Sequence, residues 1–221
     1  MRISPEAEIL DAVRQSGLRI RTALRISSLH SPEFSRKTYR IEHEEGTVKA
    51  RLLEDESTAA TLTDFRRELP EDFARVLSRF GRVLIEEWIE GEALPEVPER
   101  RHLETAGRLL GDLHARQSCR GRSLHEMRAA TDHQGAARIC LQRLASHGVL
   151  AEEAALRLES VLDRSRPPTA VHGLVHLDFC GENMVVDRSG RLRVVDNERI
   201  GLDSLAYDLA RTWYRWALPA S

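Results

Sequence analysis

Hydrophobic and polar residues alternate along three stretches near the start of the chain. The stretches are residues 19–29, 37–43 and 47–53. Alternation with a period of two is typical of strands that bury one face. In the third stretch Val48, Ala50 and Leu52 should face the core. Lys49 and Arg51 then share the opposite face, so the pattern predicts a small antiparallel sheet that carries two neighbouring cations.

A helical period of hydrophobic residues appears further along the chain. It is clearest over residues 102–118, which predict an amphipathic helix ending near His114. Further helices are expected over residues 55–67, 138–164 and 209–218. The apolar run 82–91 favours a strand that closes in a glycine, and the polar residues 119–137 favour a loop or lid. Ser4 and Pro5 are typical of a helix start and predict a short helix before the sheet.

Composition narrows the class of protein without naming a function. The 221 residues are 41% hydrophobic, and 33 Lys and Arg nearly balance 35 Asp and Glu. A net charge of −2 gives no reason to expect a nucleic acid or an anionic membrane surface as partner. The cysteines Cys119, Cys140 and Cys180 are odd in number and scattered, which favours reduced thiols and a cytoplasmic location. The start of the chain lacks the apolar core of a signal peptide, and no stretch has the length of a membrane span.

Polar residues with a specific spacing gather between residues 171 and 196. His176, Asp178 and Asn183 form the pattern H-x-D-x-x-x-x-N, and a further acid, Asp196, ends an apolar run. The two apolar runs between Asn183 and Asp196 flank the turn Arg188-Ser-Gly190, which predicts a hairpin that brings its ends together. An aspartate opposite a γ-phosphate can orient an attacking hydroxyl and accept its proton, while asparagine and aspartate oxygens can hold Mg²⁺ against phosphates.

This segment resembles the catalytic loop and metal-binding acid of the kinase-like phosphotransferases. The aminoglycoside phosphotransferase and choline kinase family fits best, because Asn197-Glu198 follows Asp196 where protein kinases have Phe-Gly. The run from Gly201 to Ala210 is similar to the family's G-x-D…D-L-A element, whose Asp208 is expected to accept hydrogen bonds from the loop backbone. Leu177 departs from the usual glycine, which concerns loop packing more than chemistry.

The resemblance implies an α+β, protein-kinase-like bilobal fold. Residues 1–90 would form the N-terminal lobe and residues 91–221 a mainly helical C-terminal lobe with a C-terminus shorter than the family norm. It also implies an ATP-dependent transfer of the γ-phosphate to a hydroxyl of a small molecule, with ATP and Mg²⁺ as cofactors. Asp178 would be the catalytic base and His176 a support of the loop, and Asn183 and Asp196 would bind the metal.

Nucleotide contacts are expected from the N-terminal half. Arg51 is the first choice for the α/β-phosphates and Lys49 the alternative. Ser35, at the tip of the first hairpin, is a further phosphate contact or else a solvated turn residue. Glu56 or Glu68 would supply the acid that pairs with the strand cation. By position alone, the backbone of Glu87, Trp88 and Ile89 would meet the adenine edge.

The acceptor stays open at this point. Amino sugars, aminoglycosides and choline-like alcohols are all used in the resembling family, and Glu198 and Asp203 could line an acidic pocket for a cationic acceptor. Two alternatives remain: a nucleotide-binding scaffold without turnover and a protein kinase, which the missing Phe-Gly and A-P-E disfavour. Relatives continue with further helices, so the aromatic helix 209–218 is expected to be left open. A partner subunit, which would make a homo-oligomer, or the middle insertion could cover it, or the chain is a shortened form of a longer one.

Overall fold

The structure is a computed structural model, and it describes residues 4–26, 38–116, 118–119, 122–123, 133–165 and 171–217. The chain begins with α1 (Pro5–Gln15), where the Oγ of Ser4 accepts a hydrogen bond from the N–H of Ala7 at 3.1 Å. Gly17, with φ of 86°, takes the left-handed conformation that ends this helix. The helix predicted at the N-terminus is therefore present, with its expected cap.

A five-stranded antiparallel sheet follows α1. Its strands are β1 (Ile20–Arg25), β2 (Thr38–His43), β3 (Gly46–Leu52), β4 (Val76–Phe80) and β5 (Val83–Glu87), in the order β1-β2-β3-β5-β4. The three predicted strands are confirmed as β1, β2 and β3, and the apolar run 82–91 contains β5. Strand β4 was not predicted because its exposed and half-buried residues show no clear alternation.

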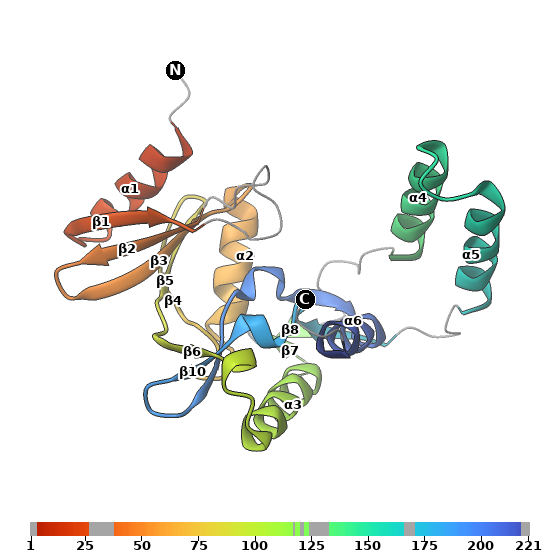
Figure 1. Ribbon diagram of the computed structural model, residues 1–221. Coiled ribbons are helices and arrows are strands. Elements are labelled where there is room, and N and C mark those ends of the chain that lie inside the picture. The colour runs from red at the N-terminus through yellow and green to blue at the C-terminus, as the bar shows by residue number, and fades with distance from the viewer. Residues whose placement is uncertain are drawn as a thin grey trace.

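Two helices lie beside this sheet (Figure 1). Helix α1 packs on the face where Val48, Ala50 and Leu52 are buried together with Ile9 and Ile41. Helix α2 (Glu56–Arg66) starts at Asp55, whose Oδ1 accepts from the N–H of Thr58 at 2.7 Å. The expected burial pattern of β3 is confirmed, so Lys49 and Arg51 project from the opposite face.

The described residues from Gly91 onward build several short strands and four longer helices. The strands are β6 (Gly91–Ala93), β9 (His172–Val175), β10 (Met184–Asp187), β11 (Leu192–Val194) and β12 (Gly201–Ser204), and the short pair β7 (Ser118–Cys119) and β8 (Arg122–Ser123). Strands β11, β10 and β6 form one antiparallel sheet, and β12 pairs with β9. The predicted hairpin is confirmed, since Met184 pairs with Val194 and Val186 with Leu192.

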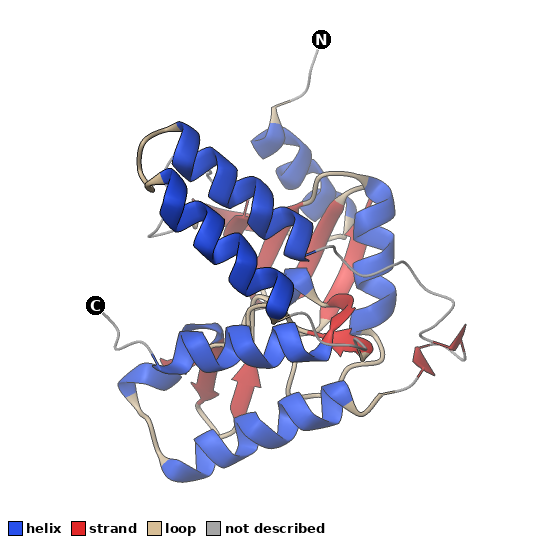
Figure 2. Cartoon of the chain, turned by 90° about the vertical axis from the view of Figure 1, so that its right-hand side faces the viewer, coloured by secondary structure: helices blue, strands red, loops and turns tan. Residues whose placement is uncertain are grey.

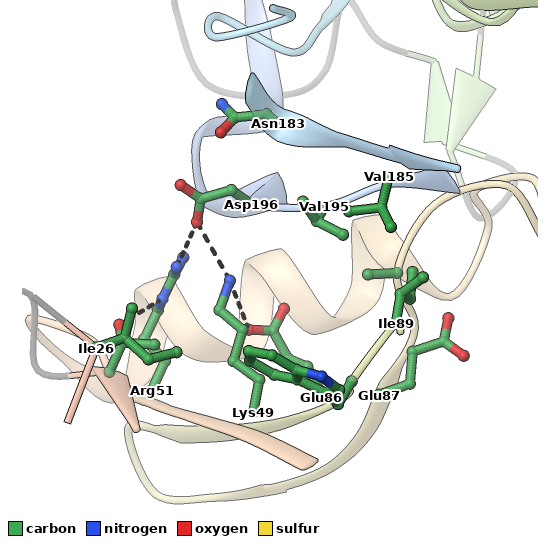
Figure 3. Close-up of a pocket in the computed structure, with 13 residues that line it drawn as sticks. Ile26, Lys49, Arg51, Glu86, Glu87, Ile89, Asn183, Val185, Val195 and Asp196 are labelled. Carbon is green, nitrogen blue, oxygen red and sulfur yellow. Dashed lines mark hydrogen bonds and ion pairs between the residues drawn. The ribbon is translucent and has the colours of Figure 1, made fainter. Parts of the chain in front are cut away.

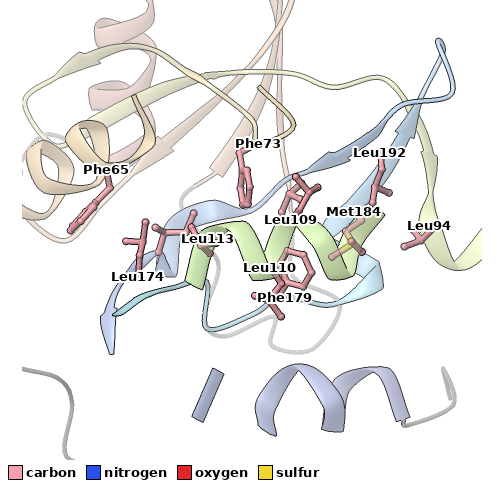
Figure 4. Close-up of a cluster of buried hydrophobic side chains, with 13 residues drawn as sticks. Phe65, Phe73, Leu94, Leu109, Leu110, Leu113, Leu174, Phe179, Met184 and Leu192 are labelled. Atoms are coloured by element: carbon pink, nitrogen blue, oxygen red, sulfur yellow. The ribbon is translucent and has the colours of Figure 1, made fainter. Parts of the chain in front are cut away.

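The main core of this half lies between α3 (Arg100–His114) and the hairpin (Figure 4). Leu109, Leu110 and Leu113 pack there with residues of the strands and of the loop before β10. The other buried members of the cluster are Phe65, Phe73, Leu94, Ala106, Leu174, Phe179, Met184, Leu192, Val194 and Ile200. The amphipathic stripe predicted from the sequence is therefore the face of α3 that packs against the hairpin and the loop before it.

Helices α4 (His133–Ser146) and α5 (Glu152–Arg164) pack against each other and project from the body of the protein (Figures 1 and 2). No described residue of α4 is buried, and Ala155 is the buried residue of α5. The start of α4 corrects the prediction of a loop through residue 137. Without a buried stripe, its first turn carries no apolar period for sequence analysis to detect.

Helix α6 (Leu205–Ala217) ends the described chain and begins earlier than residue 209, where the prediction placed it. It packs against β9 and β12 and lies next to α3 in the lower part of Figure 1. Leu209, Trp213 and Tyr214 are more than half exposed on its outer side. Trp213 and Tyr214 are therefore open as expected, whereas Trp216 packs against the main core.

Candidate active site

The segment from His176 to Asn183 is anchored through its backbone. The buried carboxylate of Asp208 accepts from the N–H of His176 at 3.0 Å and from the N–H of Leu177 at 2.7 Å. The role expected of Asp208 is thereby confirmed. His114, at the end of α3, adds a third contact, because its Nε2 lies 2.8 Å from Asp208 Oδ2. Burial raises the pKa of Asp208, but these hydrogen bonds lower the pKa by more than burial raises it. The pKa of Asp208 therefore lies below its ordinary value.

Leu177 has a backbone conformation that few side chains tolerate. Its φ of 61° lies in the left-handed region, where a Cβ atom crowds the following carbonyl oxygen. This gives a physical reason for the glycine that the resemblance leads one to expect here. The departure noted from the sequence therefore concerns the backbone of the loop, and side-chain packing is secondary.

His176 is fully buried inside the loop. Its Nε2 lies 3.1 Å from Asn197 Oδ1, and its ring packs edge-on against Phe179. Burial lowers the pKa of His176 because the charged ring would lose its hydration. These contacts hold the ring inside the loop, and the supporting role of His176 stays a prediction.

Asp178 lies at the mouth of the loop with both carboxylate oxygens engaged. Asn183 Nδ2 donates to Asp178 Oδ2 at 3.1 Å and to the backbone oxygen of Asp178 at 2.9 Å. On the other side, an Nη atom of Arg211 lies 3.2 Å from Asp178 Oδ1. The Asp178 side chain is 16% exposed. Its carboxylate is therefore held by two donors and is still accessible to a ligand.

Asn183 and Asp196 come together because the hairpin closes next to them. The N–H of Val195 donates to the backbone oxygen of Asn183 at 2.9 Å, one residue before Asp196. Asp196 has φ of 60°, a left-handed conformation that aspartate tolerates better than most residues and that turns the chain away from the hairpin. Both side chains line the same cleft, as the sequence predicted.

The two cations of β3 reach across that cleft to Asp196 (Figure 3). Lys49 Nζ lies 3.2 Å and an Nη atom of Arg51 lies 2.5 Å from Asp196 Oδ1. Arg51 also lies 3.4 Å from Thr38 Oγ1 through its Nε. The side chains of Lys49 and Arg51 are 16% and 6% exposed, so they are not a solvated strand face. The cleft therefore joins the sheet of the first half to the hairpin of the second.

The acid beside Lys49 comes from the neighbouring strand and not from α2. Glu86 is the cross-strand partner of Lys49, and its Oε2 lies 3.9 Å from Lys49 Nζ. Glu86 also pairs with the buried Arg66 of α2. Arg66, Lys49 and Arg51 together outweigh the effect of burial, which raises the pKa of Glu86, so this pKa lies below its ordinary value.

The predicted pairing of Glu56 with the strand cation is therefore corrected. Glu56 lies in the exposed first turn of α2, and its Oε1 lies 3.3 Å from an Nη atom of Arg79. Glu68 follows the last turn of α2, where its N–H donates to the backbone oxygen of Phe65 at 3.2 Å. In place of a helix acid, α2 presents Arg66, whose Nε donates to the backbone oxygen of Asn197 at 3.2 Å.

The cleft has a volume of about 280 Å³ and extends to the segment after β5. The predicted hinge residues Glu87, Trp88 and Ile89 line it, beside Ile26, Ala74 and Val185. Glu87 is held by Arg193, with an Nη atom 2.6 Å from its Oε1. The guanidinium of Arg40 lies 5.3 Å from the ring centroid of Trp88, a cation–π contact that fixes the indole.

Two expected site residues lie outside what the structure describes, and the expectation for a third is corrected. Ser35 lies outside the described residues, as does the side chain of Glu198. Asp203 does not face an open pocket, because it is buried and its Oδ1 accepts from its neighbour's N–H and lies 2.7 Å from His133 Nε2. Burial raises the pKa of the Cys180 thiol to about 11, which disfavours a reactive thiolate at this position.

A comparison with protein-family models decides the family. The model of the phosphotransferase enzyme family matches residues 2–221, which is nearly the whole chain. The chain belongs to this phosphotransferase family.

Solved structures place the fold in the same group. Macrolide 2'-phosphotransferase MphH from Brachybacterium faecium aligns with a TM-score of 0.63 at 14% identity, over 96% of this chain and 77% of that one. Choline kinase LicA from Streptococcus pneumoniae aligns at 0.59 and 14%, over 98% and 77%. The streptomycin–ATP complex of APH(2")-IIa aligns at 0.61 and 18%, over 94% and 75%. At these identities the likeness shows the kinase-like α+β fold. A comparison with curated proteins found no match.

The donor set of this phosphotransferase cleft suits magnesium. Asn183 uses its Nδ2 to hold Asp178, which leaves its amide oxygen as an acceptor, and Asp196 adds a carboxylate. Within the described ranges, no three His, Cys, Asp or Glu side chains converge as a metal-binding group. Mg²⁺ commonly takes one or two protein oxygens and completes its shell with water and substrate phosphates, so two oxygen donors fit it.

The sequence did not predict the contacts of Arg66, Glu86 and Arg211 in this site, and it marked His114 only as the end of a helix. Each belongs to an element remote from the loop motif, and its neighbours in sequence carry only the pattern of a helix or a strand. Glu86 follows three buried apolar residues of β5 and is itself buried, so an acid inside an apolar run was the one local signal for it. In the described part of the chain, no helix is long and apolar enough to cross a membrane.

Proposed function

We propose that the protein transfers the γ-phosphate of ATP to a hydroxyl group of a small molecule. The proposal rests on one observation above all: Asn183 and Asp196 share a cleft with Lys49 and Arg51, and Asp178 stands next to it on the same loop. Oxygen ligands for a cation, cations for phosphates and a carboxylate for a hydroxyl are the parts that phosphoryl transfer requires. Membership of the phosphotransferase family supports the same reaction class.

In this proposal Asp178 acts on the acceptor. Its carboxylate accepts a hydrogen bond from the acceptor hydroxyl and takes the proton as the oxygen attacks the γ-phosphorus. The new bond joins the acceptor oxygen to phosphorus, and the bond from phosphorus to the β–γ bridging oxygen breaks, so ADP leaves. Asn183 holds the carboxylate of Asp178 in one direction throughout.

Lys49 and Arg51 bind the nucleotide phosphates. Both now contact Asp196, and phosphate oxygens would replace that carboxylate as their partner. Asn183 and Asp196 would then hold Mg²⁺, which neutralises phosphate charge when it is bound. The backbone beyond Glu87 is proposed to meet the adenine, with Trp88 kept in place by Arg40.

The acceptor is proposed to be an amino sugar, an aminoglycoside-like molecule or a choline-like alcohol. Two solved neighbours are a macrolide 2'-phosphotransferase and a choline kinase, so the fold serves acceptors of different chemistry. Asp203 does not supply a negative pocket here, since it is buried against His133. The acceptor therefore has to be found by a screen, with amino sugars first.

Calorimetric titration with ATP is the primary test. Wild-type protein is expected to bind ATP more tightly with Mg²⁺ than without it, and Asp196→Ala is expected to lose that dependence on Mg²⁺. Asp178→Ala should keep nucleotide binding and lose transfer. A folded wild-type protein that binds no ATP would refute the proposal.

The two alternative functions are distinguished by the same material. Binding of Mg²⁺ and ATP without a phosphorylated product from any acceptor would favour a nucleotide-binding scaffold. Incorporation of labelled phosphate into a generic protein substrate would favour a protein kinase, and the absence of Phe-Gly after Asp196 argues against that result.

We further propose that the protein acts in the cytoplasm and that two copies associate through α6. Leu209, Trp213 and Tyr214 form an exposed apolar group there, with exposures of 51%, 73% and 58%. Grouped exposed apolar side chains are typical of protein contacts. Light scattering should give a mass above that of the monomer for wild type and a lower mass for Trp213→Ser, whereas a monomer at all concentrations would refute the association.

A further inference from the structure

Helix α6 contacts five consecutive residues of the proposed catalytic segment, His176 to Cys180. Asp208 holds the N–H groups of His176 and Leu177, and Trp216 Nε1 donates to the backbone oxygen of Phe179 at 3.0 Å. Between these two contacts, Arg211 reaches Asp178, on the same face of the helix as Asp208 three residues before it. The helix therefore fixes the backbone on both sides of Asp178 and the carboxylate itself.

The direction of the Asp178 carboxylate is set by two donors. Asn183 Nδ2 holds Oδ2 at 3.1 Å and Arg211 holds Oδ1 at 3.2 Å. A carboxylate oxygen has two lone pairs, so Oδ1 can receive Arg211 and still accept from a second donor. With one donor on each oxygen, each oxygen keeps a lone pair that an acceptor hydroxyl could use.

Among the described residues, the guanidinium of Arg211 is the one cation that forms an ion pair with the Asp178 carboxylate. The loop itself, His176-Leu-Asp-Phe-Cys-Gly-Glu-Asn183, contains neither lysine nor arginine. Arg211 lies 33 residues along the chain from Asp178, and its side chain is 31% exposed. The Nε atom of Arg211 is buried and has no hydrogen-bond partner in the described chain. The side-chain acceptor that the structure gives to Arg211 is Asp178.

We propose that Arg211 is a positioning residue for phosphoryl transfer, which orients the carboxylate of Asp178 toward the acceptor hydroxyl. This inference rests on the proposed function, because it gives Asp178 a hydroxyl to receive. A displacement of about 1 Å in a reacting group can lower the rate by about 100-fold. Loss of Arg211 should therefore act on turnover and leave the nucleotide site across the cleft unchanged.

Arg215 provides a matched control on the same helix. Its side chain is 32% exposed, close to the 31% of Arg211, and its Nε is likewise buried without a partner in the described chain. It lies 3.5 Å from Cys180 Sγ and 3.6 Å from the exposed Glu182 carboxylate, and neither group has a part in the proposed reaction. A general loosening of α6 would affect both variants, whereas loss of positioning would affect Arg211 alone.

The kinetic experiment compares Arg211→Met, Arg211→Lys and Arg215→Met with wild type, using the best acceptor of the screen or water as acceptor. Arg211→Met is expected to lower kcat about 10- to 100-fold while KM for ATP stays within about twofold. Arg211→Lys should recover part of kcat because it keeps a donor and a charge, and Arg215→Met should stay within about threefold of wild type. An unchanged or raised kcat in Arg211→Met, or an equal loss in Arg215→Met, would overturn the proposal.

A second measurement tests the contact without any turnover. A double-mutant cycle combines Asp178→Asn with Arg211→Met, and in parallel with Arg215→Met, and follows unfolding in urea. The Arg211 pair should be non-additive by up to about fivefold in the unfolding equilibrium constant, and the Arg215 pair should be additive. Additivity of the Arg211 pair would overturn the inference. A wild type that binds ATP but phosphorylates nothing would refute the proposed function instead, and the cycle would still decide whether Arg211 holds Asp178.

Discussion

The left-handed backbone of Leu177 makes a prediction whose sign is unusual. Glycine normally destabilises a protein relative to alanine, because it gains more freedom in the unfolded chain. At Leu177, with φ of 61°, any side chain with a Cβ costs about 1–2 kcal/mol. The entropy of glycine in the unfolded state costs about 0.4–1 kcal/mol. Leu177→Gly should therefore be more stable than Leu177→Ala by about 0.5–1 kcal/mol.

The comparison with alanine removes the effect of lost packing, since both variants lack the partly buried leucine side chain. Both also keep the N–H that Asp208 accepts at 2.7 Å. The assay is the free energy of unfolding in urea at neutral pH. Leu103, 42% exposed in α3, supplies the control. In that helix, Leu103→Gly should be less stable than Leu103→Ala by about 1 kcal/mol.

Opposite signs at the two leucines would establish that the loop backbone is strained at residue 177. If Leu177→Ala were as stable as Leu177→Gly or more stable, the argument from the left-handed conformation would be refuted. The conformation bears on the proposed function because residue 177 immediately precedes Asp178, the proposed catalytic base.

Three further predictions concern stability. Burial lowers the pKa of His176 in the folded protein, so the unfolded chain binds the extra proton first as pH falls. The unfolding free energy should therefore decrease below about pH 6.5, by up to about 1.4 kcal/mol per pH unit. His176→Gln should flatten this slope between about pH 6.5 and 5, and an equal slope in both proteins would contradict the prediction. Gly91→Ala should cost more than about 2 kcal/mol in urea unfolding, because its Cβ would meet the backbone oxygen of Val186 at 2.1 Å, and a smaller loss would show that β6 can shift. Arg66→Met should lower the unfolding free energy by about 3–5 kcal/mol, because Glu86 would stay buried without its arginine. Adding Glu86→Gln should recover part of this loss in the same assay. No recovery would mean that the packing of Arg66 contributes more than its charge.

Much of the site was readable because its signals are local. The turn Arg188-Ser-Gly190 and the apolar runs beside it were enough to predict a hairpin, and the hairpin alone brings Asn183 to Asp196. The alternation in β3 likewise placed Lys49 and Arg51 on one face before any fold was known. These features depend on residues that are neighbours in sequence, so a period of two and a tight turn specify them.

The partners of these residues were not readable. Glu86 lies opposite Lys49 because β5 pairs with β3 in a register that the sheet sets, and the search for an acid in the following helix led to Glu56 instead. Helix α4 was missed at its start because its exposed residues show no apolar stripe.

The sequence by itself determined the loop motif, the hairpin and the cation-bearing strand, since each follows from short-range periods and turns. Tertiary structure alone decided that Arg66 would enter from α2, that Glu86 would face Lys49 and that Arg211 would hold Asp178. The physical reason is that an ion pair between distant elements needs only two side chains at a few ångströms. Nothing in the neighbouring residues encodes that distance, which arises when buried faces pack and fix the helices and strands relative to one another.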